Sequence, residues 1–325
     1  MKRIILWIAA AALLSCGHIN DPSTGPSWRS VSNGLPENTT VKALAADAAG
    51  AVWYAGTVDG VFKSTTRGAD WQAANTGLEA RDISALAVHP KNAAIVFAGT
   101  WGKGVFRSVN AGGEWQPVWQ SGMNPLINDI VIAGDGSIWI AAEHGLYVSG
   151  DNGANWRHSF TYGKIYTVAV HPQRTSRVYI GARWNGNFRS DDAGATWQPI
   201  NKGVYSTGQE TAGAQAICFL SSGAGHMLMS TDYTNLYKSL DGGDVWERST
   251  PFFSESVLKL VGSAKSKNMW ALTKSGELFF SENEGQSWER RQDGIDAKVK
   301  TVYLTPGSEV ALAGTVGKGI FQFSE

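Results

Sequence analysis

Five carboxylates stand in short polar segments between apolar, β-like runs, and this residue type can carry acid–base chemistry. They are Asp82, Asp129, Glu143, Glu210 and Asp232. Hydrolysis of a glycosidic bond needs two such groups on either side of a cleft, one of them with a raised pKa. Any chain rich in polar loops offers as many carboxylates, so their number alone does not favour a hydrolase.

The same segments carry aromatic and basic side chains that suit binding. Flat rings flanked by charged and amide groups stack on sugars or form hot spots for protein partners. The aromatic residues that we favour most are Trp101, Trp184, Tyr205 and Tyr233. The full set of predicted ligand-binding residues is Trp101, Lys103, Arg81, Asp82, Asp129, Arg183, Trp184, Tyr205, Glu210 and Tyr233.

Metal and thiol chemistry have little support in the sequence. His89 and His171 each precede a proline at equivalent turns after apolar strands, which indicates repeated structural turns rather than paired ligands. Cys218 lies within the apolar run 216–220, so we expect a buried, inert thiol. We predict no catalytic residue, no metal and no cofactor.

An eight-residue pattern, here called the box, recurs six times and organises the chain. Its copies are STTRGADW (64–71), SVNAGGEW (108–115), SGDNGANW (149–156), SDDAGATW (190–197), SLDGGDVW (239–246) and SENEGQSW (281–288). A short polar side chain at position three can bond turn amides, Gly at five can adopt positive φ, and Trp at eight can bury a large ring. The predicted structural residues are Ser64, Gly68, Trp71, Ser108, Trp115, Ser149, Asp151, Trp156, Ser190, Asp192, Trp197, Ser239, Asp241, Trp246, Ser281 and Trp288.

The box resembles the Asp-box, or BNR, repeat (S-x-D-x-G-x-T-W) of sialidases, sortilin-type receptors, xyloglucanases and a photosystem II assembly factor. The resemblance covers essentially the whole mature chain and implies a β-propeller. Position three departs from the repeat's Asp in three copies, which carry Thr66, Asn110 and Asn283. We expect those three turns to be somewhat weaker.

Seven units follow from counting strands. Apolar runs that could form inner strands start at Val41, Ile83, Ile127, Ile165, Ala216, Val257 and Val299. Only six boxes are complete, but residues 23–28 (STGPSW) fit box positions three to eight and residues 319–325 fit a third strand. We therefore predict an all-β fold over residues 28–325: a seven-bladed β-propeller of four-stranded antiparallel blades, closed by pairing of the N- and C-terminal strands.

The N-terminus has the features of a bacterial lipoprotein signal. Lys2 and Arg3 precede about eleven apolar residues and the segment Leu13-Leu14-Ser15-Cys16. We predict a signal peptide over residues 1–15, lipidation at Cys16, and a short tether over residues 16–27. The chain would then be anchored to a membrane of the bacterial cell envelope, facing the periplasm or the outside.

Function is expected on one face of the disc. In a propeller blade, the loops before the inner strands and the turns between second and third strands share a face, here called the upper face, whereas the boxes lie on the opposite, box face. Variable loops on a rigid scaffold are the usual place for binding. Residues 203–215 form the longest of these loops and contain Tyr205 and Glu210.

We predict a non-catalytic binding or assembly scaffold that takes a protein or glycan on the upper face and acts as a monomer. With 28 basic and 28 acidic residues, the chain gives no electrostatic reason to bind nucleic acid. The alternative is a glycoside hydrolase of the xyloglucanase or sialidase type. Only Arg81 and Arg183 are placed to grip a sialic acid carboxylate, and the segment 56–60 departs from the opening pattern of xyloglucanases.

Overall fold

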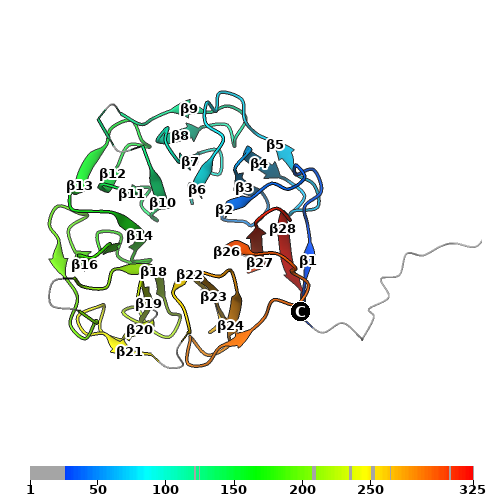
Figure 1. Cartoon of the computed structure of the whole chain (residues 1–325). Coiled ribbons are helices and arrows are strands. Elements are labelled where there is room, and N and C mark those ends of the chain that lie inside the picture. The colour runs from blue at the N-terminus through cyan, green and yellow to red at the C-terminus, as the bar shows by residue number, and fades with distance from the viewer. Residues whose placement is uncertain are drawn as a thin grey trace, which may run out of the picture.

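The chain forms a ring of seven β-sheets around a central axis (Figure 1). A computed structural model describes residues 26–324 except 121, 124, 207–209, 234–235, 250–252, 264 and 307–308. The predicted signal peptide and Cys16 lie outside the described residues. Within them every sheet has four antiparallel strands, so the prediction of a seven-bladed β-propeller is confirmed.

Each blade runs from the channel to the rim through an inner, a second, a third and an outer strand. The inner strands are β2 (Val41–Ala46), β6 (Ile83–Val88), β10 (Ile127–Ile132), β14 (Ile165–Val170), β18 (Ala214–Phe219), β22 (Val257–Gly262) and β26 (Val299–Leu304). The second strands are β3 (Trp53–Thr57), β7 (Val96–Thr100), β11 (Ile138–Ala142), β15 (Val178–Ala182), β19 (Met227–Thr231), β23 (Met269–Thr273) and β27 (Ala311–Thr315). The third strands are β4 (Gly60–Ser64), β8 (Val105–Ser108), β12 (Gly145–Ser149), β16 (Gly186–Ser190), β20 (Leu236–Ser239), β24 (Leu278–Ser281) and β28 (Ile320–Ser324). The outer strands are β5 (Gln72–Ala73), β9 (Gln116–Pro117), β13 (Arg157–Phe160), β17 (Gln198–Pro199), β21 (Glu247–Arg248), β25 (Glu289–Arg290) and β1 (Ser27–Ser30).

The two ends of the chain close the ring. Strand β1 pairs antiparallel with β28, so that Ser27 faces Ser324 and Trp28 faces Phe323. The Trp28 ring lies 5.1 Å from that of Trp270 in the preceding blade, and its indole N–H donates to the Arg291 carbonyl at 3.0 Å. The predicted closure is therefore confirmed, and it leaves no open sheet edge at either end of the repeat array.

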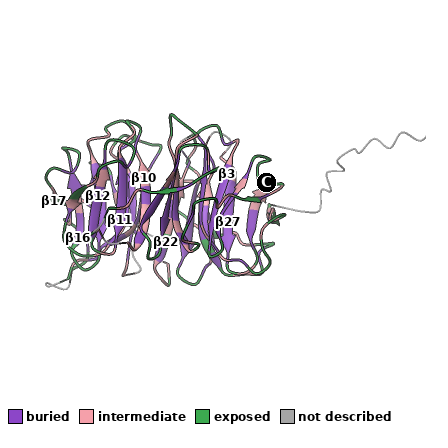
Figure 2. Ribbon diagram, turned by 90° about the horizontal axis from the view of Figure 1, so that it is seen from above, coloured by how far each residue is buried: buried purple, intermediate pink, exposed green. Residues whose placement is uncertain are grey.

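The core lies between blades. All seven second strands are buried at every residue, because the two neighbouring blades cover both faces of each blade (Figure 2). Close approach depends on glycines in these strands. A Cβ on Gly56 would come within 2.6 Å of the Ile83 side chain of the next blade, and one on Gly99 within 2.5 Å of Ile127. The small residues of the A-G-T segments thus set the distance between blades.

The six complete boxes fold as one repeated turn. In the second, the Ser108 hydroxyl accepts a hydrogen bond from the Gly112 amide at 2.8 Å and donates to Asn110, whose oxygen accepts the Glu114 amide at 2.8 Å. The Trp115 indole donates to the Ala74 carbonyl of the preceding blade at 2.8 Å. The box is therefore a turn, and in the first four boxes its indole also bonds the preceding blade. The indole N–H groups of Trp246 and Trp288 are buried without a hydrogen-bond partner among the described residues.

Two details extend or correct the sequence analysis. Position four of all six boxes also has positive φ, as at Arg67 (53°) and Gly242 (79°), so two consecutive residues are left-handed, not only the glycine at position five. The Thr66 box makes the same bonds as the others, and its expected weakness stays a prediction. The fifth inner strand begins at Ala214 and not at Ala216, because Ala214 pairs with Thr231 and Gln215 is an extra residue in the strand.

Candidate functional site

Every inner strand carries a β-bulge at its second residue, where the chain enters the channel from the upper face. In β2, for example, Val41 pairs with Thr57 and Ala43 with Gly56, which leaves Lys42 as an extra residue. A bulge re-aims a side chain without disturbing the rest of the strand. The seven bulged residues are Lys42, Ser84, Asn128, Tyr166, Gln215, Leu258 and Lys300.

These residues surround a cavity of about 320 Å³ at the upper end of the central channel. Its wall also includes the third residue of each inner strand, among them Asp129, Thr167, Lys259 and Thr301. In contrast to the box positions, which repeat, these positions differ from blade to blade. The same bulge thus presents six different residue types around one opening, and only lysine occurs twice, at Lys42 and Lys300.

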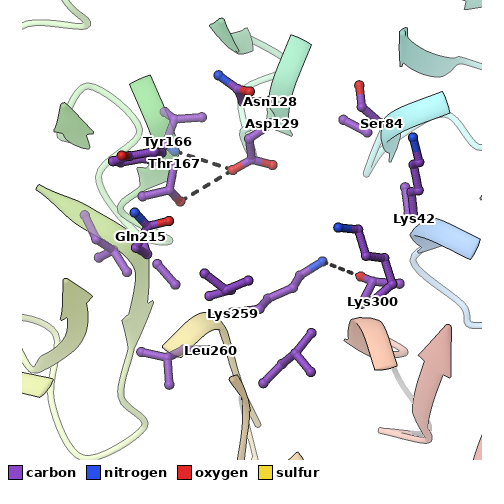
Figure 3. A pocket seen from close by; sticks show the side chains of 18 of the residues that line it. Lys42, Ser84, Asn128, Asp129, Tyr166, Thr167, Gln215, Lys259, Leu260 and Lys300 are labelled. Carbon is purple, nitrogen blue, oxygen red and sulfur yellow. Dashed lines mark hydrogen bonds between the residues drawn. The ribbon is translucent and has the colours of Figure 1, made fainter. Parts of the chain in front are cut away.

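Asp129 is the one carboxylate among the described residues of the cavity wall. Its Oδ1 accepts the Ile130 amide at 2.9 Å, and its Oδ2 faces the Val168 amide at 3.4 Å and the Thr167 hydroxyl at 3.5 Å (Figure 3). Burial raises the pKa of the Asp129 carboxyl above its ordinary value, against the charge of Lys259 and these hydrogen bonds. Asp129 therefore links the third and fourth blades through hydrogen bonds.

Three lysines from adjacent blades stand on the other side of the cavity. Lys42 forms a 2.5 Å ion pair with Asp82 of the next blade. Lys259 reaches the following blade, where its ammonium donates to the Thr301 hydroxyl at 3.0 Å (Figure 3). Burial lowers the pKa of Lys259 below its ordinary value, and the charge of Asp129 opposes this. No described carboxylate forms an ion pair with Lys259 or Lys300.

The turns between second and third strands form a second ring outside the cavity. In each blade the amide of the first turn residue donates to the carbonyl just before an inner strand, as Trp101 does to Asp82 at 3.1 Å. The seven first turn residues are Val58, Trp101, Glu143, Arg183, Asp232, Lys274 and Val316. Their side chains therefore start from equivalent backbone positions around the rim of the channel.

The first aromatic cluster spans the second to fourth blades. The Lys164 ammonium lies 6.0 Å from the centre of the Trp101 ring and 5.5 Å from that of Tyr166. It also forms a 2.5 Å ion pair with Glu143. Trp101 is 48% exposed and is therefore accessible to a ligand.

A second cluster surrounds the turn of the fourth blade. The Arg183 guanidinium lies 4.0 Å from the centre of the Trp184 ring, and Trp184 is half exposed with φ of 62°. A bulky residue with positive φ is uncommon and is held here by its neighbours. The Thr211 amide of the long loop donates to the Trp184 carbonyl at 3.2 Å, so this loop is anchored on the fourth blade.

The long loop also brings two predicted tyrosines together. The rings of Tyr205 and Tyr233 lie 5.5 Å apart, and the Tyr233 hydroxyl donates to Glu210 at 3.2 Å. Tyr205 is half exposed, whereas Tyr233 packs partly against the core of the fifth blade. Burial raises the pKa of the nearby Asp232 carboxyl.

The structure thus divides the ten predicted ligand-binding residues. Six of them belong to the aromatic groups described above, which are the Trp101 cluster, the Trp184 cluster and the tyrosine pair. These six are Trp101, Arg183, Trp184, Tyr205, Glu210 and Tyr233. Asp129 belongs to the channel wall, and Asp82 is engaged by Lys42. Arg81 and Lys103 are exposed.

Sequence reasoning missed the channel lysines Lys42, Lys259 and Lys300. A signal was present, because polar residues interrupt the second or third position of otherwise apolar inner strands, as in V-K-A and V-L-K. In a half-buried strand of period two, such a residue looks like ordinary alternation. Only the bulge, which turns two consecutive side chains toward the channel, makes the position distinctive.

Exposed apolar side chains gather on the upper face. Nine large hydrophobic residues are exposed among those described, and two of these, Val109 and Leu240, lie in boxes. The other seven belong to upper-face turns, loops or the channel mouth: Val58, Trp101, Tyr162, Trp184, Tyr205, Leu258 and Val316. They are spread over the blades, and all seven lie on the face that carries the variable loops.

Metal, thiol and histidine chemistry have little support among the described residues. They contain no group of three or more His, Cys, Asp or Glu side chains that could hold a metal ion. Cys218 is partly buried, and burial raises the pKa of its thiol to about 12, so it stays protonated. His89 and His171 each accept the amide two residues on, in equivalent turns. No helix long and apolar enough to cross a bilayer occurs in the described part of the chain.

Comparisons with known proteins support the fold. No protein-family model matches the chain, and no curated protein matches it in sequence. Among solved structures, a GH74 xyloglucanase from Xanthomonas campestris superposes with a TM-score of 0.71 at 19% identity, over 92% of this chain and 53% of the other. YCF48 bound to D1 peptide gives 0.69 at 13% identity, over 92% and 97% of the two chains.

A third similar structure is the extracellular domain of a one-component system from B. thetaiotaomicron, with a TM-score of 0.71 at 15% identity over 92% of this chain and 40% of that one. This chain spans about half the length of the xyloglucanase chain. At these identities the likeness concerns the fold, which hosts a hydrolase in one neighbour and a bound peptide in another. The chain is therefore a seven-bladed β-propeller similar to GH74 enzymes and to YCF48.

Proposed function

We propose that this protein is an Asp-box propeller of the bacterial cell envelope, lipid-anchored through Cys16, which binds a polypeptide partner on its upper face without catalysis. The observation that carries the proposal is the concentration of exposed apolar side chains on that face. They include aliphatic residues such as Val58, Leu258 and Val316 as well as aromatic rings. Aliphatic side chains offer little to a sugar ring, whereas they pack well against apolar residues of a polypeptide.

The surrounding geometry supports a preorganised surface. A cation lies over each of the two exposed indole rings, Lys164 at 6.0 Å from the centre of Trp101 and Arg183 at 4.0 Å from that of Trp184. The long loop is bonded to the turn of the fourth blade through the Thr211 amide. Ring side chains lose little conformational entropy when they bind. The likeness to YCF48, whose structure was determined with a D1 peptide, supports the same reading at the level of the fold.

The position of β1 indicates how the disc is oriented on the membrane, because this strand begins on the box face. Residue Ser27 pairs with Ser324 at the end of the third strand, on the same side as the boxes. A short tether from Cys16 would therefore hold the box face toward the membrane and leave the upper face open. The similarity to an extracellular domain from B. thetaiotaomicron supports a location in the envelope.

The test compares a displayed random-peptide library with a glycan array, using the purified chain. We expect peptides to be enriched, and we expect Trp101→Ala and Trp184→Ala to weaken their binding about tenfold or more, as hot-spot truncations do. The matched controls are Val109→Ser and Leu240→Ser, which change exposed apolar residues on the box face. Glycan binding that the two tryptophan variants abolish, with no peptide enriched, would refute the polypeptide assignment.

A glycoside hydrolase is the second candidate, and one observation favours it. Asp129 and Asp232 both have carboxyl pKa values raised by burial, as the acid of an inverting glycosidase requires. Against it, Asp129 is bonded to backbone amides of two blades and ties them together. Release of reducing ends from xyloglucan by the purified chain would establish this candidate.

A further inference from the structure

We infer that the channel cavity is a carboxylate-binding site, in which Lys259 and Lys300 receive an acidic group of the polypeptide that the upper face binds. This rests on the proposed function and adds the chemistry of the partner. The cavity has three lysines and one carboxylate among its described lining residues, and its volume of about 320 Å³ suits a single side chain or chain end rather than a folded domain.

The hydrogen-bonding capacity of Lys259 supports the inference. Its ammonium has three donors, and the hydroxyl of Thr301 at 3.0 Å takes one of them. The Lys259 side chain belongs to the channel wall, where the charge of Asp129 acts on it, but no described carboxylate lies within ion-pair distance of its ammonium. Holding a cation in such surroundings costs free energy unless an anion completes it. The surroundings of the Lys259 ammonium therefore favour binding of a negatively charged ligand.

The other charged groups around the cavity favour binding of the carboxylate on one side of it. Asp129 is bonded to amides of the third and fourth blades, and Lys42 is already paired with Asp82. Lys259 and Lys300, on the neighbouring sixth and seventh blades, are the two lysines of the wall without such a partner among the described residues. The Lys259 ammonium is bonded to Thr301, the residue that follows Lys300 in β26, and Figure 3 shows this hydrogen bond.

The bulges explain how a β-sheet presents two cations so close to its axis. In β22 the bulge at Leu258 places Lys259 on the channel wall, and in β26 the bulge places Lys300 there together with Thr301. Leu258 is 40% exposed at the same opening and offers an apolar contact beside the cations. An extended segment could therefore lie across the aromatic region and end with its carboxylate between the two lysines.

A direct measurement tests the cavity without any peptide. Protein carrying ¹³C-labelled lysine is titrated with acetate and, separately, with inorganic phosphate, and the Cε–Hε signals are assigned with Lys→Met variants. We expect acetate to shift the signals of Lys259 and Lys300 in a saturable way and to leave Lys318, an exposed upper-face lysine, unchanged. A shift of equal size at all three lysines, or none at all, would overturn the inference even if peptides bind.

Peptides enriched on the upper face then distinguish the source of the carboxylate. Each is synthesised with a free C-terminal acid, with a C-terminal amide, and with internal Asp and Glu changed to Asn and Gln. We expect one of the two changes to weaken binding to the wild-type chain about tenfold and to have no effect on the Lys259→Met, Lys300→Met double variant. The Lys318→Met variant should bind like the wild type.

Failures of the two proposals are separable. If no peptide is enriched but acetate binds at the two lysines, the polypeptide assignment fails and the anion site stands. If peptides bind through Trp101 and Trp184 but respond to neither change, the polypeptide assignment stands and the carboxylate site is wrong.

Discussion

Closure of the ring by the two chain ends can be tested with a single covalent bond. Ser27 and Ser324 face each other in the β1–β28 pair, and the Ser324 hydroxyl donates to the Ser27 carbonyl at 3.2 Å. Facing residues of an antiparallel pair have Cα atoms about 4.5–5.5 Å apart, which a disulfide can bridge. We therefore expect Ser27→Cys, Ser324→Cys to form a disulfide spontaneously on air oxidation.

The expected stabilisation follows from the length of chain that the bond encloses. A loop of about 300 residues corresponds to about 5–6 kcal/mol in the chain-entropy treatment, and engineered bonds commonly give about 2–4 kcal/mol. With a urea dependence of about 3 kcal/mol per M, the oxidised form should unfold about 1 M higher in urea than the reduced form. Cys218 should not interfere, because the pKa of its thiol is raised to about 12.

The matched control moves one cysteine along the strand. Ser30 faces Phe321, three residues away from Ser324 along β28. Three residues of a strand span about 10 Å, which exceeds the reach of a disulfide. Both variants are made in a Cys16→Ser background and compared by thiol titration and urea unfolding. If the Ser30→Cys, Ser324→Cys pair cross-links as readily as the first pair, or if the bond leaves the unfolding midpoint unchanged, the described closure is wrong.

Three further predictions concern the boxes and the channel. Ser108→Ala should lower the free energy of unfolding by about 1–3 kcal/mol, because it leaves the buried amide of the box glycine without an acceptor, and urea unfolding measures this. Hydrogen bonds within the boxes lower the pKa of Asp151 and Asp192 to about 2, below the ordinary value of about 3.9. Their contribution to stability is therefore present above about pH 4 and is lost as the pH falls toward 2, so Asp151→Asn, Asp192→Asn should flatten the dependence of Tm on pH in that window. Xyloglucan should yield no reducing ends with the wild-type chain; if it does, and Asp129→Asn and Asp232→Asn both abolish the release, the binding assignment must be abandoned.

The repeat made most of the fold predictable from the sequence. The boxes are local in sequence: Ser108 and Trp115 are seven residues apart, and the turn between them is fixed by hydrogen bonds within the segment. Such short-range rules can be read without a structure. The number of blades and the pairing of the two ends followed from counting these units, and both are confirmed. The start of the fifth inner strand was misplaced because a bulge shifts its register.

The candidate site was only partly predictable, because it depends on which residues of different blades meet. Trp101 and Trp184 could be placed on the upper face from their turns, and Arg183 was predicted beside Trp184, yet the contact of Lys164 with Trp101 became apparent only from the packing. Asp82 looked like a free ligand-binding group until Lys42, forty residues earlier, was found beside it.

The sequence by itself therefore determined the class of fold, the repeated turn and the face on which variable loops lie, since these follow from residue types within one unit. Only the tertiary structure decided what faces the axis, since bulges at Lys42 and Lys300 rotate side chains out of the period-two pattern. It also brought Lys259 and Asp129, 130 residues apart in the chain, to the wall of one cavity. The physical reason is that closing the ring brings together residues of inner strands that lie far apart in the sequence. No local pattern indicates which of these residues will face each other.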